Sequence, residues 1–201
     1  FPSGSVRMLL LFAPLLVLVS AMVGSQWDEF SDWLITPRLL IETSSFPTSA
    51  DAQRSGSLAA YPYGWHYISF LASLLAGRFL ENAGALVNVF MLLTFSFLSI
   101  RLIRAGLAHT KDTLTPGWIL CAIAGLSTTL LNTTFVQKVT ITSYADFATA
   151  VIAGLGTIVG WYMLAALVEK DHKSVLHSSV QVGLLMMLLV NLKQSTIVLA
   201  V

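Results

Sequence analysis

The chain has 201 residues, of which 56% are hydrophobic and 10% are charged, with a formal net charge of +1 and a mean hydropathy of +0.78. A soluble domain cannot cover so much apolar surface, so the composition predicts an integral membrane protein. The near-zero charge excludes a nucleic-acid partner, because no basic face exists to neutralise phosphates. The single cysteine, Cys121, excludes a disulfide framework and a cysteine metal cluster.

Five apolar stretches are predicted to span the membrane, since roughly 17 to 25 apolar residues suffice. They cover residues 8–24, 83–103, 117–135, 146–168 and 177–200. The first also has features of a secretory signal, but the spans that follow favour an uncleaved helix with Arg7 in the cytoplasm. The chain begins with Phe1 and stops inside an apolar run. We therefore expect residues 1–201 to be a single all-α transmembrane module that is truncated at its C-terminus.

The stretch 65–80 decides the topology. It is short for a span, and polar or small residues recur along it at helical spacing, which predicts a helix at the membrane interface or dipping partly into it. If it does not cross, the cytoplasmic side holds Arg7, Arg101, Arg104, Lys111, Lys170 and Lys173, against Arg38, Arg54, Arg78 and Lys138 outside. If it crosses, the cytoplasm keeps only Arg7, Arg78 and Lys138. The positive-inside rule favours the first arrangement, which makes residues 25–82 a non-cytoplasmic loop with juxtamembrane helices.

Three carboxylates stand between two tryptophans at the start of this loop: Asp28, Glu29 and Asp32 lie between Trp27 and Trp33. In a chain so poor in charge, this cluster is the best candidate for an active site. A carboxylate beside tryptophans at a membrane surface can have a raised pKa and serve as a general base. The alternative is that Asp28 caps a helix while the tryptophans anchor the chain at the interface. Asp32 is interpreted as a solvated acid on a helix face.

The rest of the loop is predicted to contain a helix over about 28–41, which Pro37 limits, and the interfacial helix, which begins at Tyr61-Pro62. The positive end of the interfacial helix suits an anionic lipid phosphate. His66 near this end is either a polar rim residue or a ligand.

Polar residues also stand at the outward ends of two later spans. Tyr144 and Asp146 open the fourth span, where Asp146 either caps the helix or supplies a second carboxylate opposite Asp28. Lys193 lies near the outer part of the last span. An ionisable side chain there is either functional or extends to the interface, and a phosphate leaving group would need such a cation.

Two further patterns have structural interpretations. The glycines at 154, 156 and 160 have the wrong spacing for a dinucleotide loop, and Gly156 and Gly160 predict close helix packing. Asn88 predicts a hydrogen bond between helices.

The chain resembles the N-terminal half of the GT-C fold glycosyltransferases, integral membrane enzymes that include protein O-mannosyltransferases and lipid A aminoarabinose transferases. The similar features are Asp28-Glu29 after the first span, Tyr61-Pro62 at a juxtamembrane helix, Tyr144-Ala145-Asp146 at an outward helix end, and Lys193 in a Leu-Lys-Gln-Ser context. The resemblance covers nearly the whole chain by order and topology.

This resemblance implies a multi-pass protein of the cell membrane with its active site on the non-cytoplasmic face. The reaction would move a sugar from a polyprenyl-phosphate donor to a hydroxyl of a lipid, glycan or protein acceptor, with inversion. Asp28 would be the base, supported by Glu29. Substrate would be bound by Tyr61, Pro62, His66, Tyr144, Asp146, Lys193 and Arg38. No residue is assigned to a metal, and the need for a divalent cation is left open. The alternative from another class is a non-catalytic transporter or flippase of lipid-linked glycans.

Overall fold

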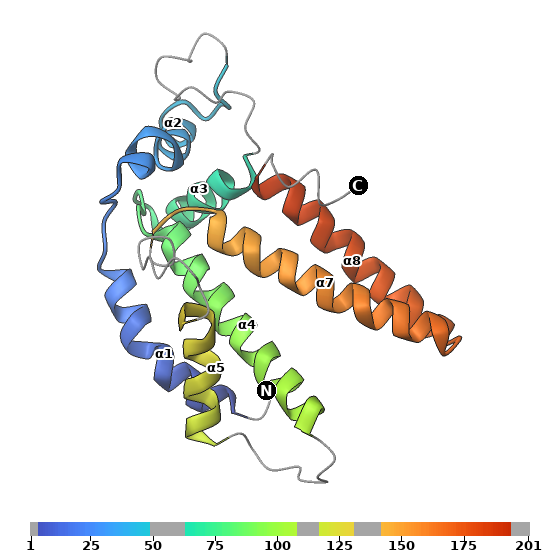
Figure 1. The fold of residues 1–201 in the computed structure, drawn as a ribbon. Helices are drawn as coiled ribbons and strands as arrows, with labels where there is room; N and C mark the ends of the chain where they lie inside the picture. The colour runs from blue at the N-terminus through green and yellow to red at the C-terminus, as the bar shows by residue number, and fades with distance from the viewer. Residues whose placement is uncertain (1–3, 49–62, 108–116, 131–141, 194–201) are drawn as a thin grey trace.

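A computed structural model describes residues 4–48, 63–107, 117–130 and 142–193, and every regular element in these ranges is helical. The elements are α1 (Ser5–Ser20), the π-helix η1 (Glu29–Trp33), α2 (Ile35–Thr43), α3 (Gly64–Ala76), α4 (Ala83–Leu107), α5 (Trp118–Leu130), α7 (Asp146–Val168) and α8 (His172–Leu192). The predicted all-α class is confirmed for the described part of the chain (Figure 1).

Three of the described helices are long and apolar enough to cross a membrane, namely Ala83–Ile103 within α4, α7 and α8. The regions of the other two predicted spans also form apolar helices, α1 and the described part of α5, but these are shorter. At 1.5 Å per residue, the 16 residues of α1 extend over about 24 Å, less than the ~30 Å of a bilayer core. The structure therefore supports a membrane protein with three span-length helices, and the predicted count of five is not confirmed.

The fourth predicted span, 146–168, has the same bounds as α7. The bounds predicted for the last span, 177–200, are wrong. The helix begins earlier, because the Asp171 carboxylate accepts hydrogen bonds from the backbone N–H groups of Lys173 and Ser174 and so caps α8 at His172. It ends at Leu192, and residues after 193 lie outside the described part of the chain.

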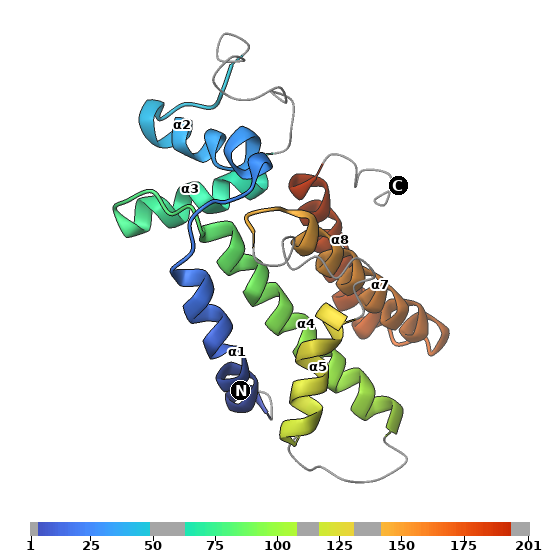
Figure 2. The ribbon, with the colours of Figure 1, turned by 60° about the vertical axis from the view of Figure 1, so that its left-hand side comes forward.

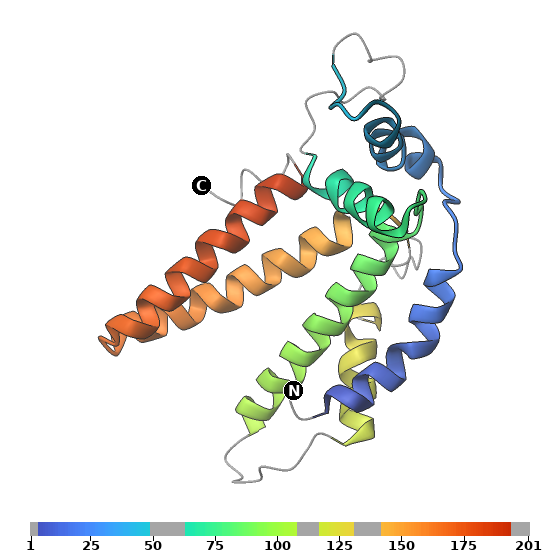
Figure 3. The same cartoon turned by 180° about the vertical axis from the view of Figure 1, so that it is seen from behind.

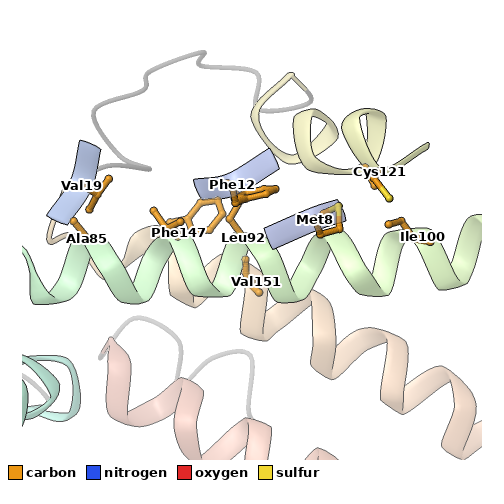
Figure 4. Close-up of a cluster of buried hydrophobic side chains, with 11 residues drawn as sticks. Met8, Phe12, Val19, Ala85, Leu92, Ile100, Cys121, Phe147 and Val151 are labelled. Atoms are coloured by element: carbon orange, nitrogen blue, oxygen red, sulfur yellow. The ribbon is translucent and has the colours of Figure 1, made fainter. Parts of the chain in front are cut away.

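The main core joins α1, α4, α5 and the first turns of α7 (Figure 4). Met8 and Phe12 of α1 pack with Leu92 of α4, and Phe147 and Val151 of α7 contribute to the same cluster. This packing places the C-terminal end of α1 beside the N-terminal ends of α4 and α7.

Helices α7 and α8 form an antiparallel hairpin whose far end diverges from α1, α4 and α5 (Figures 1 and 3). A Cβ added at Gly156 would lie 3.0 Å from Cε of Met186 on α8, so the predicted close packing at this glycine is confirmed. At Gly160 the prediction is wrong, because nothing lies within 4 Å of an added Cβ.

The shorter helices α2 and α3 lie across the end of the bundle where α4 begins (Figure 2). The predicted helix over 28–41 is in fact two elements, η1 and α2. Pro37 does not limit α2, because it lies in the first turn, where its missing N–H would have no helical partner. Helix α3 begins at Gly64, so the predicted start at Tyr61-Pro62 falls on residues that the structure does not describe.

Candidate active site where the helix ends meet

The short segment 142–144, directly before α7, is the structural centre of the site. The side-chain amide of Asn88 on α4 donates to the carbonyl oxygens of Thr142 and Tyr144, each at 2.9 Å. The Ser143 hydroxyl donates to the carbonyl oxygen of Glu81 at 2.9 Å. The hydrogen bond predicted for Asn88 is therefore present, and it holds the backbone of the residues that open α7.

Two residues from the segment 25–82 hold the same residues. Nε1 of Trp65 on α3 donates to the Ser143 carbonyl oxygen at 2.6 Å, and the Ser143 N–H donates to Oε1 of Glu29 at 2.7 Å. Oε2 of Glu29 accepts the N–H groups of Ser25 and Gln26 at 2.8 and 3.0 Å. Glu29 is only 3% exposed. Its two oxygens accept hydrogen bonds from backbone donors, so Glu29 fixes the acidic segment to the residues before α7.

The π-helix η1 determines which acids are buried. Its wide turn is closed by the Leu34 N–H, which donates to the Glu29 carbonyl oxygen at 2.8 Å. Glu29 and Trp33 face the protein, while Asp28 is exposed. Asp28 makes no side-chain capping hydrogen bond, so the alternative that it caps the helix is wrong. Its carboxylate lies close enough to the Tyr144 hydroxyl to raise the pKa of that phenol.

The Tyr144 hydroxyl lies at the centre of the acidic groups. Burial, the charge of Asp28 and the hydrogen bond to Asp28 raise the pKa of this phenol to about 12, and the charges of Glu29 and Asp146 act in the same direction. Carboxylates from the segment 25–82 and from α7 are thus within electrostatic range of one hydroxyl, and the phenol stays protonated at neutral pH.

Asp32 is not the solvated acid that the sequence suggested. It is half-buried, and desolvation followed by the charge of Asp28 raises the pKa of its carboxyl. The available signal was its position four residues after Asp28 and directly beside Trp33. It was missed because spacing alone does not show which side of a π-helix turn faces the protein.

An aromatic stack forms one side of the site. The rings of Trp33 and His66 are stacked, with centroids 5.2 Å apart and planes 18° apart. The Trp33 ring also contacts Tyr144 at 6.4 Å, and Tyr63 meets His66 edge-on at 6.0 Å. His66 is 1% exposed, so the interpretation as a rim residue is wrong. As a ligand it would act only through rearrangement of this stack.

Lys193 and Asp146 form an ion pair at the open end of the α7–α8 hairpin. Lys193 is the first residue after α8 and has an extended backbone, while Asp146 lies in the first turn of α7. Neither side chain is fully buried, at 31% and 45% exposed, so an anion can compete for the lysine. Asp146 thus holds a cation near Tyr144.

Arg38 reaches the site only through Glu81, a residue that sequence reasoning missed. Nη2 of Arg38 is 3.3 Å from Oε1 of Glu81, and the guanidinium lies over the Phe79 ring at 4.9 Å. Oε2 of Glu81 accepts the Gly24 N–H at 3.0 Å. Glu81 therefore offsets the charge of Arg38 and ties it to the exit of α1.

The structure brings together most of the predicted site residues. Those that gather around the segment 142–144 are Asp28, Glu29, His66, Tyr144, Asp146 and Lys193. Tyr61 and Pro62 lie outside the described residues. Within the described ranges, no three or more His, Cys, Asp or Glu side chains are placed to hold a metal ion.

Comparison with protein-family models, with curated proteins and with solved structures finds no match for this chain.

Proposed function

We propose that this chain is part of a membrane glycosyltransferase that moves a sugar from a polyprenyl-phosphate donor to an acceptor hydroxyl on the non-cytoplasmic side, with Asp28 as the base. The observation that carries the proposal is the contrast between adjacent acids. Glu29 is buried and fixed by three backbone donors, whereas Asp28, the next residue along the chain, is exposed and lies close enough to the Tyr144 hydroxyl to act on its pKa. A general base needs this combination of access and fixed position.

The proposed reaction has the following steps. The acceptor oxygen forms a bond to the anomeric carbon on the face opposite the phosphate, and the bond from that carbon to the phosphate oxygen breaks. The acceptor proton passes to Asp28, and the lipid phosphate leaves with the electron pair. Attack opposite the leaving group inverts the anomeric carbon, and an activated phosphate leaving group makes a separate acid less necessary.

Lys193 is the cation best placed to offset the charge that grows on the leaving phosphate. Its partner Asp146 is 45% exposed, so a phosphate can approach the ammonium without entering a closed core. Arg38 is less suited, because Glu81 already offsets its charge. His66 is less suited as well, because it is buried against Trp33 and only 1% exposed.

The full-length protein in lipid nanodiscs, supplied with radiolabelled polyprenyl-phosphate sugars, provides the test. Release of polyprenyl phosphate should fall by about 10²- to 10⁴-fold in Asp28→Asn, the usual contribution of a general base. Asp32→Asn is the matched control, an acid in the same segment that should stay within about tenfold of the wild type. Retained turnover in Asp28→Asn would remove Asp28 as the base.

The competing function is a transporter or flippase of lipid-linked glycans. A carrier needs polar groups along the middle of several spans. In the described part of α4 the two buried polar side chains are already engaged: Asn88 binds the carbonyl oxygens before α7, and Ser96 binds its own helix at Leu92. Movement of intact donor across the bilayer without phosphate release would favour the carrier and overturn the proposed reaction.

A further inference from the structure

Helix α3 buries its polar side chains, together with Trp65, and exposes large apolar side chains on the opposite face. His66, Ser69 and Ser73 are each no more than 2% exposed. The opposite face carries large apolar residues that are 42% to 90% exposed: Tyr67, Leu71, Leu74 and Leu75. A helix that packs against protein in water shows the reverse arrangement.

Part of the polar face of α3 is held by contacts within the protein. The Ser73 hydroxyl donates to the Ser69 carbonyl oxygen at 2.7 Å and accepts the Leu80 N–H at 3.0 Å. His66 stacks on Trp33. Because this face is buried, α3 cannot turn it to water without losing these contacts. The leucine face is therefore the side that meets the surroundings, and in water it would form an exposed apolar patch.

The position of α3 identifies what covers this face. The helix is seated on α4 and α8, two of the span-length helices (Figures 1 and 2). At its start, a Cβ on Gly64 would lie 2.5 Å from the Asn191 carbonyl oxygen, so the backbones of α3 and α8 are in direct contact. Within about one turn of Asn191, α8 exposes Met187 and Leu188. The start of α3 thus lies against the end of a helix that is long enough to cross the membrane.

We propose that α3 is embedded in the hydrocarbon of the membrane leaflet next to the candidate site, with Tyr67, Leu71, Leu74 and Leu75 against lipid acyl chains. The sequence predicted a helix at or near the interface; the structure adds which face meets lipid and that the polar stripe faces protein. Gly77, with a φ of 65°, ends the helix, and the exposed Arg78 follows, where its long side chain can extend to the headgroup phosphates. The proposal depends on the membrane insertion of α4 and α8, not on the proposed transfer reaction.

Nitroxide spin labels on introduced cysteines test this in the full-length protein. The background is Cys121→Ala, and each label is placed by Leu71→Cys or Leu75→Cys. Glu42→Cys, on the exposed face of α2, is the water control. Leu184→Cys, on the exposed face of α8, is the lipid control. The protein is reconstituted into vesicles of phosphatidylcholine and phosphatidylglycerol, and collision with oxygen and with a water-soluble nickel chelate is measured by power saturation.

Labels at 71 and 75 should behave like the label at 184. Their ratio of oxygen to nickel accessibility should exceed that at 42 by about tenfold, because a polar chelate is excluded from hydrocarbon. Nickel accessibility equal to that at 42 would place the face in water. Accessibility to neither reagent would mean that protein covers it, with a second copy indicated by dipolar broadening between labels. Either result overturns the proposal. Leu75 is 90% exposed, so a label there does not disturb the packing of α3.

Discussion

Replacing Glu29 by glutamine tests whether the buried carboxylate holds the candidate site together. The carboxylate accepts three backbone N–H groups, from Ser25, Gln26 and Ser143, at 2.8, 3.0 and 2.7 Å. Glutamine keeps one acceptor oxygen but places an NH₂ group against at least one of these donors. At least one charge-assisted bond is then lost and a buried donor is left unsatisfied.

A hydrogen bond to a charged group contributes about 1.5–3 kcal/mol, and an unsatisfied buried group costs a similar amount, with partial relaxation. We therefore expect Glu29→Gln to lower the free energy of unfolding by about 2–4 kcal/mol. Glu29→Asp should also destabilise the protein, because the shorter side chain cannot reach Ser143 while holding Ser25 and Gln26.

Equilibrium unfolding of the detergent-solubilised protein by increasing fractions of a denaturing detergent, followed by tryptophan fluorescence, measures the effect. Glu42→Gln is the matched control. Glu42 is exposed on α2, so its substitution should change the stability by less than about 0.5 kcal/mol. If Glu29→Gln and Glu42→Gln unfold together, the carboxylate is not holding the two segments, and the argument that Asp28 is fixed in position fails with it.

Three further outcomes follow from the same contacts. In the same unfolding assay, Gly64→Ala should destabilise the protein by about 1–3 kcal/mol, because its Cβ would clash with the Asn191 backbone. Gly160→Ala should be neutral or stabilising, because nothing lies within 4 Å of an added Cβ there. Asp32→Asn should stabilise the protein at pH 7, because the raised pKa of Asp32 means that its ionised carboxylate destabilises the folded state. This gain in stability should disappear below the unfolded pKa of 3.8, where the carboxyl is protonated in both states. A gain that does not depend on pH would contradict this cause. The pKa of Tyr144 is about 12 in the folded protein, against 10.0 ordinarily, so the free energy of unfolding should be unaffected below pH 10 and should fall as the pH rises to 12. Tyr144→Phe should lack this fall. If the variant and the wild type show the same dependence of stability on pH, Tyr144 is not the cause.

Much of the fold could be predicted because apolar helices are local. The bounds of α7 follow from where polar residues give way to an apolar run, and the same signal located α4. The end of α8 could not be predicted this way, because the apolar run continues past Lys193 while the helix stops at Leu192, where Lys193 turns to pair with Asp146. That ion pair joins residues 47 positions apart, so no local pattern contains it.

The candidate site was predictable as a set of residues but not as a set of roles. Charged residues are rare in this chain, and ionisable side chains in or near a membrane are costly unless they have a function or a partner. This argument identified Asp28, Glu29, Asp146 and Lys193 as candidates. Which acid is exposed depends on the wide turn of the π-helix η1. A prediction of helix faces that assumes 3.6 residues per turn does not reproduce this turn.

The sequence by itself determined the environment of this protein, because composition and the length of apolar runs depend on transfer free energies that act residue by residue. Only the tertiary structure decided what each polar residue does. Glu29 became a buried anchor and Asp28 an accessible acid because Ser143, 114 residues away, supplies the donor that holds one and not the other. The tertiary structure likewise placed His66 of α3 against Trp33 and left the leucines of that helix exposed.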